Sequence, residues 1–201
     1  VKSTDDKDRV LSNEEMKYLL ESVHEHEEKH FYIQDYAIEL ASLTGMRVGE
    51  IAALRWSSIT KDYIIIKESE HRLDYADKTC EYIISHTKNR KIRRFPITNE
   101  IRILLSRIRT VLNENNVDNE FVFSNKKGRV NSHTISCAIN RRCEEAGIDK
   151  RSIHSLRRTV SSNLRKVLPV ATVANLLGHL EETNEQYYNY DVVDINTKIA
   201  H

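Results

Sequence analysis

Four separated fragments of the chain carry side chains suited to binding an anion and attacking it. An arginine stands between two glycines in a Thr-Gly-Met-Arg-Val-Gly-Glu run, and a lysine follows Thr87. A His-Ser-Leu-Arg-Arg run comes later, then a Gly-His pair followed nine residues on by a tyrosine. The side chains concerned are Arg47, Lys88, His154, Arg157, His179 and Tyr188. If they converge, the arginines, lysine and histidines form an anion site, and the tyrosine supplies a nucleophile without a metal.

Helical periodicity predicts the elements that must position these residues. Ser12 and Glu15 form a capping box, and apolar residues follow at helical spacing up to Val23. A second helix from Ile33 should stop at the Thr44-Gly45 pair, with a short helix over 48–54 after it. Further helices are predicted over 101–112, 135–143, 156–166, 170–177 and 183–190.

The period changes between these helical regions. Residues 63–67, 80–86 and 93–97 are rich in β-branched and aromatic side chains and are separated by turn residues, which predicts three strands. The order of helices, strands and helices indicates a mainly α class with a small three-stranded antiparallel sheet.

Composition limits the class of protein. The chain has 201 residues, 39% of them hydrophobic, and only five Gly and two Pro, which fits one globular unit rather than a disordered chain. Three cysteines without paired spacing indicate free thiols, and the longest aliphatic run, Ile64-Ile65-Ile66, is far too short for a membrane span. We therefore expect a cytoplasmic protein without a membrane partner.

Charge is distributed unevenly although the net charge is +1. Residues 1–50 hold 6 basic against 12 acidic side chains, residues 85–109 hold 8 against 1, and residues 141–166 hold 8 against 3. Such polarity suits a polyanion partner, although solvated helix faces also produce charge runs.

One motif suggests zinc instead. His26-Glu27-Glu28-Lys29-His30 matches H-E-x-x-H, which on a helix offers two metal ligands and a general base. The run is very polar and no third ligand is apparent, so we interpret it as a solvated helix end.

The ordered fragments resemble the catalytic domain of the tyrosine recombinase family, the phage-type integrases. The resemblance extends from Leu11 to Tyr188, and all four fragments occur in family order and spacing. It implies the tyrosine recombinase catalytic fold, with residues 1–10 a linker from an N-terminal core-binding domain, 11–190 the catalytic domain and 191–201 a C-terminal tail.

The resemblance also implies a function. The expected activity is site-specific DNA recombination or integration, in which strands are cut and rejoined through a covalent 3′-phosphotyrosyl intermediate, without metal, cofactor or ATP. The expected partners are double-stranded DNA and, on DNA, a homotetramer. Tyr188 would be the nucleophile, and the activating residues would be Arg47, Lys88, His154, Arg157 and His179. Glu50 matches the acid that supports the first arginine.

Some assignments keep alternatives. Tyr187 and Tyr190 lie close to Tyr188, but Tyr187 would face about 100° away on a helix, and Lys91 competes with Lys88. A catalytically silent DNA-binding descendant of the same fold is the alternative function. Phosphate contacts are expected from basic side chains of the two basic blocks: Arg90, Lys91, Arg93, Arg94, Arg141, Arg142, Lys150 and Arg151.

Overall fold

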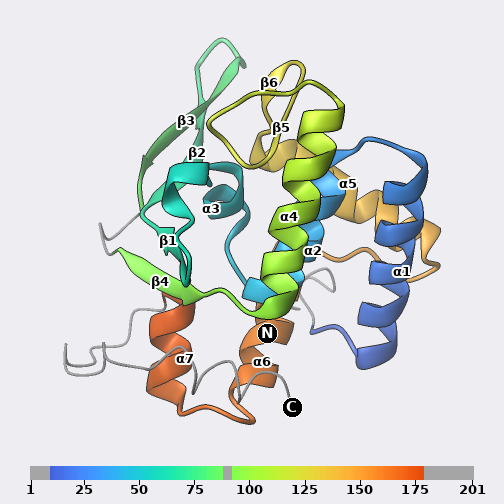
Figure 1. Cartoon of the computed structure of the whole chain (residues 1–201), viewed down its shortest axis with the longest axis vertical. Helices are drawn as coiled ribbons and strands as arrows, with labels where there is room; N and C mark the ends of the chain where they lie inside the picture. Colours follow the sequence, from blue (N-terminus) through green and yellow to red (C-terminus); the bar gives the residue numbers. More distant parts are fainter. Residues whose placement is uncertain (1–9, 88–91, 179–201) are drawn as a thin grey trace.

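Seven helices make up most of the described fold. The computed structural model describes residues 10–87 and 92–178 (Figure 1). The predicted helices inside these ranges are all present: α1 (Asn13–Lys29), α2 (Ile33–Thr44), α3 (Val48–Ala52), α4 (Asn99–Glu114), α5 (Ser132–Glu145), α6 (Ile153–Leu164) and α7 (Val170–Leu177). The helix predicted over 183–190 lies outside the described residues.

The central element is α2, which packs against α1, α4, α5 and α6. Most of its residues are buried, including the polar Asp35, so that the other helices form a shell around it. Figure 1 shows α1 and α5 on one side of α2, with α6 and α7 at the lower end of the molecule. Because α2 ends at Thr44, the Gly-Met-Arg segment that follows it lies next to α6 and α7.

Local signals set the helix ends. The Ser12 side chain accepts from the backbone N–H of Glu15, and the Glu15 carboxylate accepts from that of Ser12, which confirms the predicted capping box at α1. Gly45 ends α2 with a φ of 62°, in the left-handed region that favours glycine. The Thr44-Gly45 stop signal is therefore confirmed.

The antiparallel strands confirm the fold class but pair differently from a single three-stranded sheet. β1 (Tyr63–Ile66) pairs with β4 (Arg93–Pro96), and β2 (Glu68–Asp74) pairs with β3 (Cys80–His86). Because only Lys67 separates β1 from β2, the two pairs are joined at that residue, where the Thr87 N–H donates to the Lys67 carbonyl at 3.3 Å.

The sequence did not predict β2, since its residues Glu-Ser-Glu-His-Arg-Leu-Asp are mostly polar and lack strand alternation. Three short elements were missed as well: the 3₁₀ turn η2 (Trp56–Ser58), and β5 (Ser124–Asn125) with its partner β6 (Gly128–Arg129).

In the His26–His30 run, Glu28, Lys29 and His30 are exposed at the end of α1 as expected, whereas His26 and Glu27 are half-buried and form ion pairs. The His26 Nδ1 atom lies 2.6 Å from Oδ2 of the buried Asp35, and Glu27 forms an ion pair with Arg107. Among residues 10–87 and 92–178, no three His, Cys, Asp or Glu side chains gather in a way that could hold a metal ion. No helix in these ranges is long and apolar enough to cross a membrane.

Glu27 gives the fold a pH dependence. Burial raises its pKa to about 8, against the opposing charge of Arg107. The folded carboxyl therefore holds its proton where the unfolded chain releases it, so the free energy of unfolding falls as pH rises from about 4.5 to about 8. Glu27→Gln should raise the melting temperature at pH 8, by about 2–4 °C for each kcal/mol of unfolding free energy regained. At pH 4 it should change the melting temperature little.

Thermal unfolding by circular dichroism at the two pH values checks this expectation. Glu28→Gln, at the exposed neighbouring position, is the control and should change neither melting temperature. A lower melting temperature for Glu27→Gln at pH 8 would mean that the ion pair with Arg107 outweighs the burial of the carboxylate.

Candidate active site

Three helices meet at Gly45. A Cβ atom at this position would lie 3.0 Å from Cδ2 of Leu177 in α7 and 3.2 Å from Cγ1 of Val160 in α6. The close approach requires a residue without a side chain, in addition to the positive φ. Arg47 follows two residues later as the N-cap of α3, so the sequence places its guanidinium where α2, α3, α6 and α7 converge.

The carboxylate of Glu50 binds two arginines. Its oxygens accept from the Arg47 N–H at 2.8 Å and from Arg47 Nη1 at 3.1 Å. They also accept from Arg93 Nη1 at 2.8 Å and Arg93 Nη2 at 2.6 Å, a bidentate pair. Burial alone would raise the pKa of Glu50, but the hydrogen bonds and charge of Arg93, helped by Arg47, outweigh it and lower the pKa. Glu50 is therefore a fixed negative charge.

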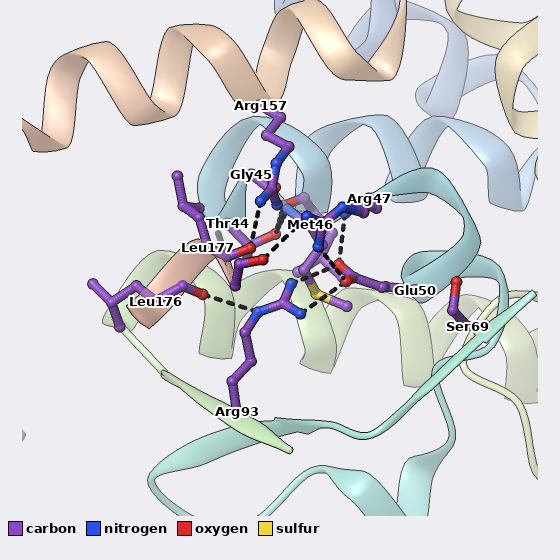
Figure 2. A network of polar contacts seen from close by, with 12 residues as sticks. Thr44, Gly45, Met46, Arg47, Glu50, Ser69, Arg93, Arg157, Leu176 and Leu177 are labelled. Atoms are coloured by element: carbon purple, nitrogen blue, oxygen red, sulfur yellow. Dashed lines mark hydrogen bonds and ion pairs between the residues drawn. The ribbon is translucent and has the colours of Figure 1, made fainter. Parts of the chain in front are cut away.

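The carboxyl end of α7 binds the same arginines and a third. Arg93 Nε donates to the Leu176 carbonyl at 3.0 Å, and Arg47 Nη2 donates to that of Gly178 at 3.1 Å. Arg157 donates to the Leu177 carbonyl through Nη2 and to the Gly45 carbonyl through Nη1, the latter at 2.8 Å. Three consecutive carbonyls at the negative end of a helix thus each hold one arginine (Figure 2).

The result is a preorganised cationic site. Arg157 is 2% exposed, and burial together with the neighbouring charge of Arg47 lowers its pKa to about 10, so it stays protonated at neutral pH. Three guanidinium groups around one carboxylate leave an excess of two positive charges. Because the Arg47 side chain is 46% exposed, an anion can reach the site from its side. Such an arrangement stabilises negative charge on a bound phosphate.

The described residues contain three of the six predicted catalytic side chains. Arg47 and Arg157 lie at the site, joined through Gly45 and the end of α7. His154 is exposed on the first turn of α6, one turn before Arg157. Lys88, His179 and Tyr188 lie outside the described residues, so their roles stay predictions. His179 directly follows Gly178, whose carbonyl binds Arg47.

The loop before α6 is held by an ion pair between a buried arginine and a half-buried glutamate. Arg151 is 0% exposed and pairs with Glu15 of the α1 capping box. The backbone N–H of Leu11, just before α1, donates to Thr159 Oγ1 in α6 at 2.9 Å. The start of the described chain therefore packs against the helix that carries His154 and Arg157.

The predicted DNA-contacting residues divide into three groups. Arg94, Arg141 and Lys150 are exposed, whereas Arg90 and Lys91 lie outside the described residues. Three others do not belong to an exposed surface, which corrects the expectation from the sequence: Arg93 pairs with Glu50, Arg142 with Asp35 and Glu145, and Arg151 with Glu15. Their charges are neutralised inside the fold and are not presented to a ligand from its surface.

Sequence reasoning missed Arg93 as part of the arginine site. A signal was present, because Arg93 shares its face of β4 with Phe95 while the intervening Arg94 points to solvent. In a strand of alternating pattern, an arginine in register with a core phenylalanine must find a buried acid.

The chain is similar to known proteins in sequence and in structure. A model of the phage integrase family matches residues 9–192. A XerC-like tyrosine recombinase of Caldanaerobacter subterraneus subsp. tengcongensis is 29% identical over 194 residues, covering 85% of this chain and 47% of the relative. This chain thus spans about half the length of that curated relative.

Solved structures agree on the fold. The catalytic core of phage lambda integrase superposes with a TM-score of 0.62 at 19% identity, covering 88% of this chain and 94% of that one. A lambda integrase tetramer bound to a Holliday junction gives a TM-score of 0.63 at 19% identity, covering 90% of this chain and 49% of that one. The fold and the arginine site thus define a domain of the integrase catalytic type. The chain belongs to the phage integrase family.

Arg93 should be a main contributor to the stability of this site. Arg93→Met leaves the Glu50 carboxylate with Arg47 alone and the Leu176 carbonyl without its donor. Breaking a buried pair in this way costs about 3–5 kcal/mol of unfolding free energy. Arg94→Met, the same substitution at the exposed neighbour, should cost less than about 0.5 kcal/mol. Urea denaturation of the two variants measures the difference, and equal losses would show that Glu50 does not depend on Arg93.

Proposed function

We propose that the chain is the catalytic domain of a site-specific DNA recombinase that cuts and rejoins double-stranded DNA through a covalent bond to Tyr188. Membership of the phage integrase family supports the reaction class. The observation that carries the proposal is the site where Arg47 and Arg157 are fixed on the end of α7 beside the carboxylate of Glu50. A silent descendant would have no need to hold the half-exposed guanidinium of Arg47 in this orientation.

The arginines would act on the phosphodiester. Attack on phosphorus produces a pentacoordinate transition state with added negative charge on the non-bridging oxygens. Guanidinium groups that are already oriented stabilise this charge without reorganising, often the largest catalytic contribution. His179, placed by sequence next to the Gly178 carbonyl that binds Arg47, would add a further donor.

Proton transfers would be divided among the remaining residues. The Tyr188 phenol must lose its proton to attack, and His154 is our candidate acceptor. The bond from Tyr188 Oη to phosphorus forms as the bond from phosphorus to O5′ breaks, and Lys88 would give its proton to O5′. Because one phosphodiester replaces another, religation needs no ATP.

DNA would be held mainly through its phosphates. Arg94, Arg141 and Lys150 are the exposed candidates in the described residues, with Arg90 and Lys91 outside them. Affinity should therefore fall steeply with salt. The lambda integrase structure named above is a tetramer on a Holliday junction, and we propose a similar homotetramer on DNA here, acting in the cytoplasm.

Formation of a covalent adduct tests the proposed function. The chain, and in parallel the longest natural protein that contains it, is incubated with nicked suicide duplexes that carry a randomised segment. Adducts are then separated on a denaturing gel and their DNA is sequenced. We expect an adduct that forms in EDTA and is abolished by Tyr188→Phe, because the phenol oxygen is the attacking atom.

Tyr187→Phe is the matched control and should retain the adduct. An adduct that survives Tyr188→Phe would move the nucleophile to another tyrosine. If neither protein yields an adduct with any sequence in the pool, the silent DNA-binding alternative is correct.

Lys88 can be tested separately through the leaving group. Lys88→Ala should slow cleavage of ordinary DNA by about 10²–10⁴-fold, the usual contribution of a general acid. A duplex with a 5′-bridging sulfur at the cleavage site should restore the rate, because a thiolate leaves without a proton. The measurement is the single-turnover cleavage rate on both substrates. Lack of rescue would remove Lys88 from the general-acid role.

A further inference from the structure

We infer that Arg129 and Glu70 are positioning residues, which hold the β2–β3 hairpin at the angle that brings Lys88 to the scissile phosphate. The inference rests on the proposed function, in which Lys88 is the general acid. Neither residue belongs to the arginine site around Glu50.

Apart from the packing of α3 against β2 and a half-buried ion pair from Glu68 to Arg55 at 3.0 Å, the hairpin has few other anchors on the helical body. In β2 only Ser69 and Glu70 are buried, and in β3 no residue is fully buried. The hairpin projects from the body at the upper left of Figure 1. An element with so little buried surface is free to change its angle unless polar contacts at its base hold it.

Glu70 provides such a contact from the hairpin side. Its side chain is 0% exposed and forms an ion pair with Arg129 of β6. Its Oε1 atom also accepts from the backbone N–H of Ser132, the first residue of α5, at 2.7 Å. The carboxylate therefore sits at the amino-terminal, positive end of α5.

Arg129 extends the contact across both strands and into the body. Its Nη2 atom donates to the Tyr82 carbonyl in β3 at 3.2 Å, and its Nη1 atom lies 3.4 Å from the Ala52 carbonyl at the end of α3. The guanidinium lies 5.6 Å from the centre of the Phe121 ring. One side chain thus joins β2, β3 and α3.

The position of α3 links this contact to the arginine site. A Cβ atom on Gly49 would lie 2.5 Å from the Glu70 carbonyl oxygen, so the backbone of α3 is in direct contact with β2. Glu50, the next residue, holds Arg47 and Arg93. The base of the hairpin is therefore fixed against the same short helix that fixes the arginines.

The hairpin leads directly to Lys88. β3 ends at His86, paired with Glu68, and the Thr87 N–H donates to the Lys67 carbonyl. Lys88 is the next residue in the sequence. If β3 moves about its base, the backbone at Thr87 that precedes Lys88 moves with it. A misplacement of a catalytic group by about 1 Å costs about 10²-fold in rate.

A substrate whose leaving group needs no proton distinguishes a role in positioning Lys88 from a role in the stability of the fold. Arg129→Lys keeps a positive charge beside Glu70, but an ammonium lacks the planar fork that reaches two carbonyls at once. We expect it to slow single-turnover cleavage of ordinary DNA by about 10²-fold. The 5′-bridging sulfur duplex should restore the rate of Arg129→Lys to that of the unmodified chain, as it does for Lys88→Ala. Glu70→Gln, which retains an acceptor for Ser132, should behave in the same way and serves if Arg129→Lys does not fold.

Arg107→Gln is the control. Arg107 pairs with Glu39 and Glu27 on the other side of the helical body, so its loss should lower stability without changing the ratio of rates on the two substrates. An Arg129→Lys deficit that persists on the sulfur duplex overturns the inference while Tyr188 and Lys88 keep their roles. If Lys88→Ala itself is not rescued, both the acid assignment and this inference fail, and an absent Tyr188 adduct refutes the proposed function as a whole.

Discussion

The negative end of α7 and the carboxylate of Glu50 together hold three arginines, and the rest of the site depends on that interaction. Guanidinium groups repel one another, and burial disfavours their charge. The carbonyls of Leu176, Leu177 and Gly178 and the oxygens of Glu50 offset both effects. Because each arginine is fully oriented by acceptors from the protein, the positive potential exists before any anion arrives.

This arrangement explains why glycine occurs where the elements meet. Gly178 has a φ of 68°, and a Cβ atom there would lie 3.1 Å from Nη1 of Arg93. Gly45 and Gly49 allow α7 and β2 to approach the ends of α2 and α3 at similarly short range. The glycines flanking Arg47 in the sequence are therefore packing requirements of the site, in addition to turn residues.

The sequence was informative wherever a local rule decides the structure. Periodicity and capping predicted every α-helix in the described residues, since an apolar stripe and an N-cap act within a few positions. β2 was missed because its stability comes from pairing with β3 and from the buried Glu70, which no local pattern reveals. The fragments that contain Arg47 and Arg157 predicted an anion site. That both arginines bind carbonyls at the end of α7 could be seen only in the folded structure.

The distribution of charge along the sequence was the least reliable predictor of which arginines are exposed. Arg142 and Arg151 stand in a basic block of the sequence, yet each has a partner more than a hundred positions earlier, Asp35 and Glu15 respectively, although Arg142 also pairs with its neighbour Glu145. A buried arginine must be paired, and the pairing acid is chosen by the tertiary fold rather than by neighbours in sequence. The same rule assigns Glu50 to Arg93 of β4, and Glu70 of β2, the strand that pairs with β3, to Arg129. Since both acids lie on or against α3, this five-residue helix links the base of the β2–β3 hairpin to the arginines.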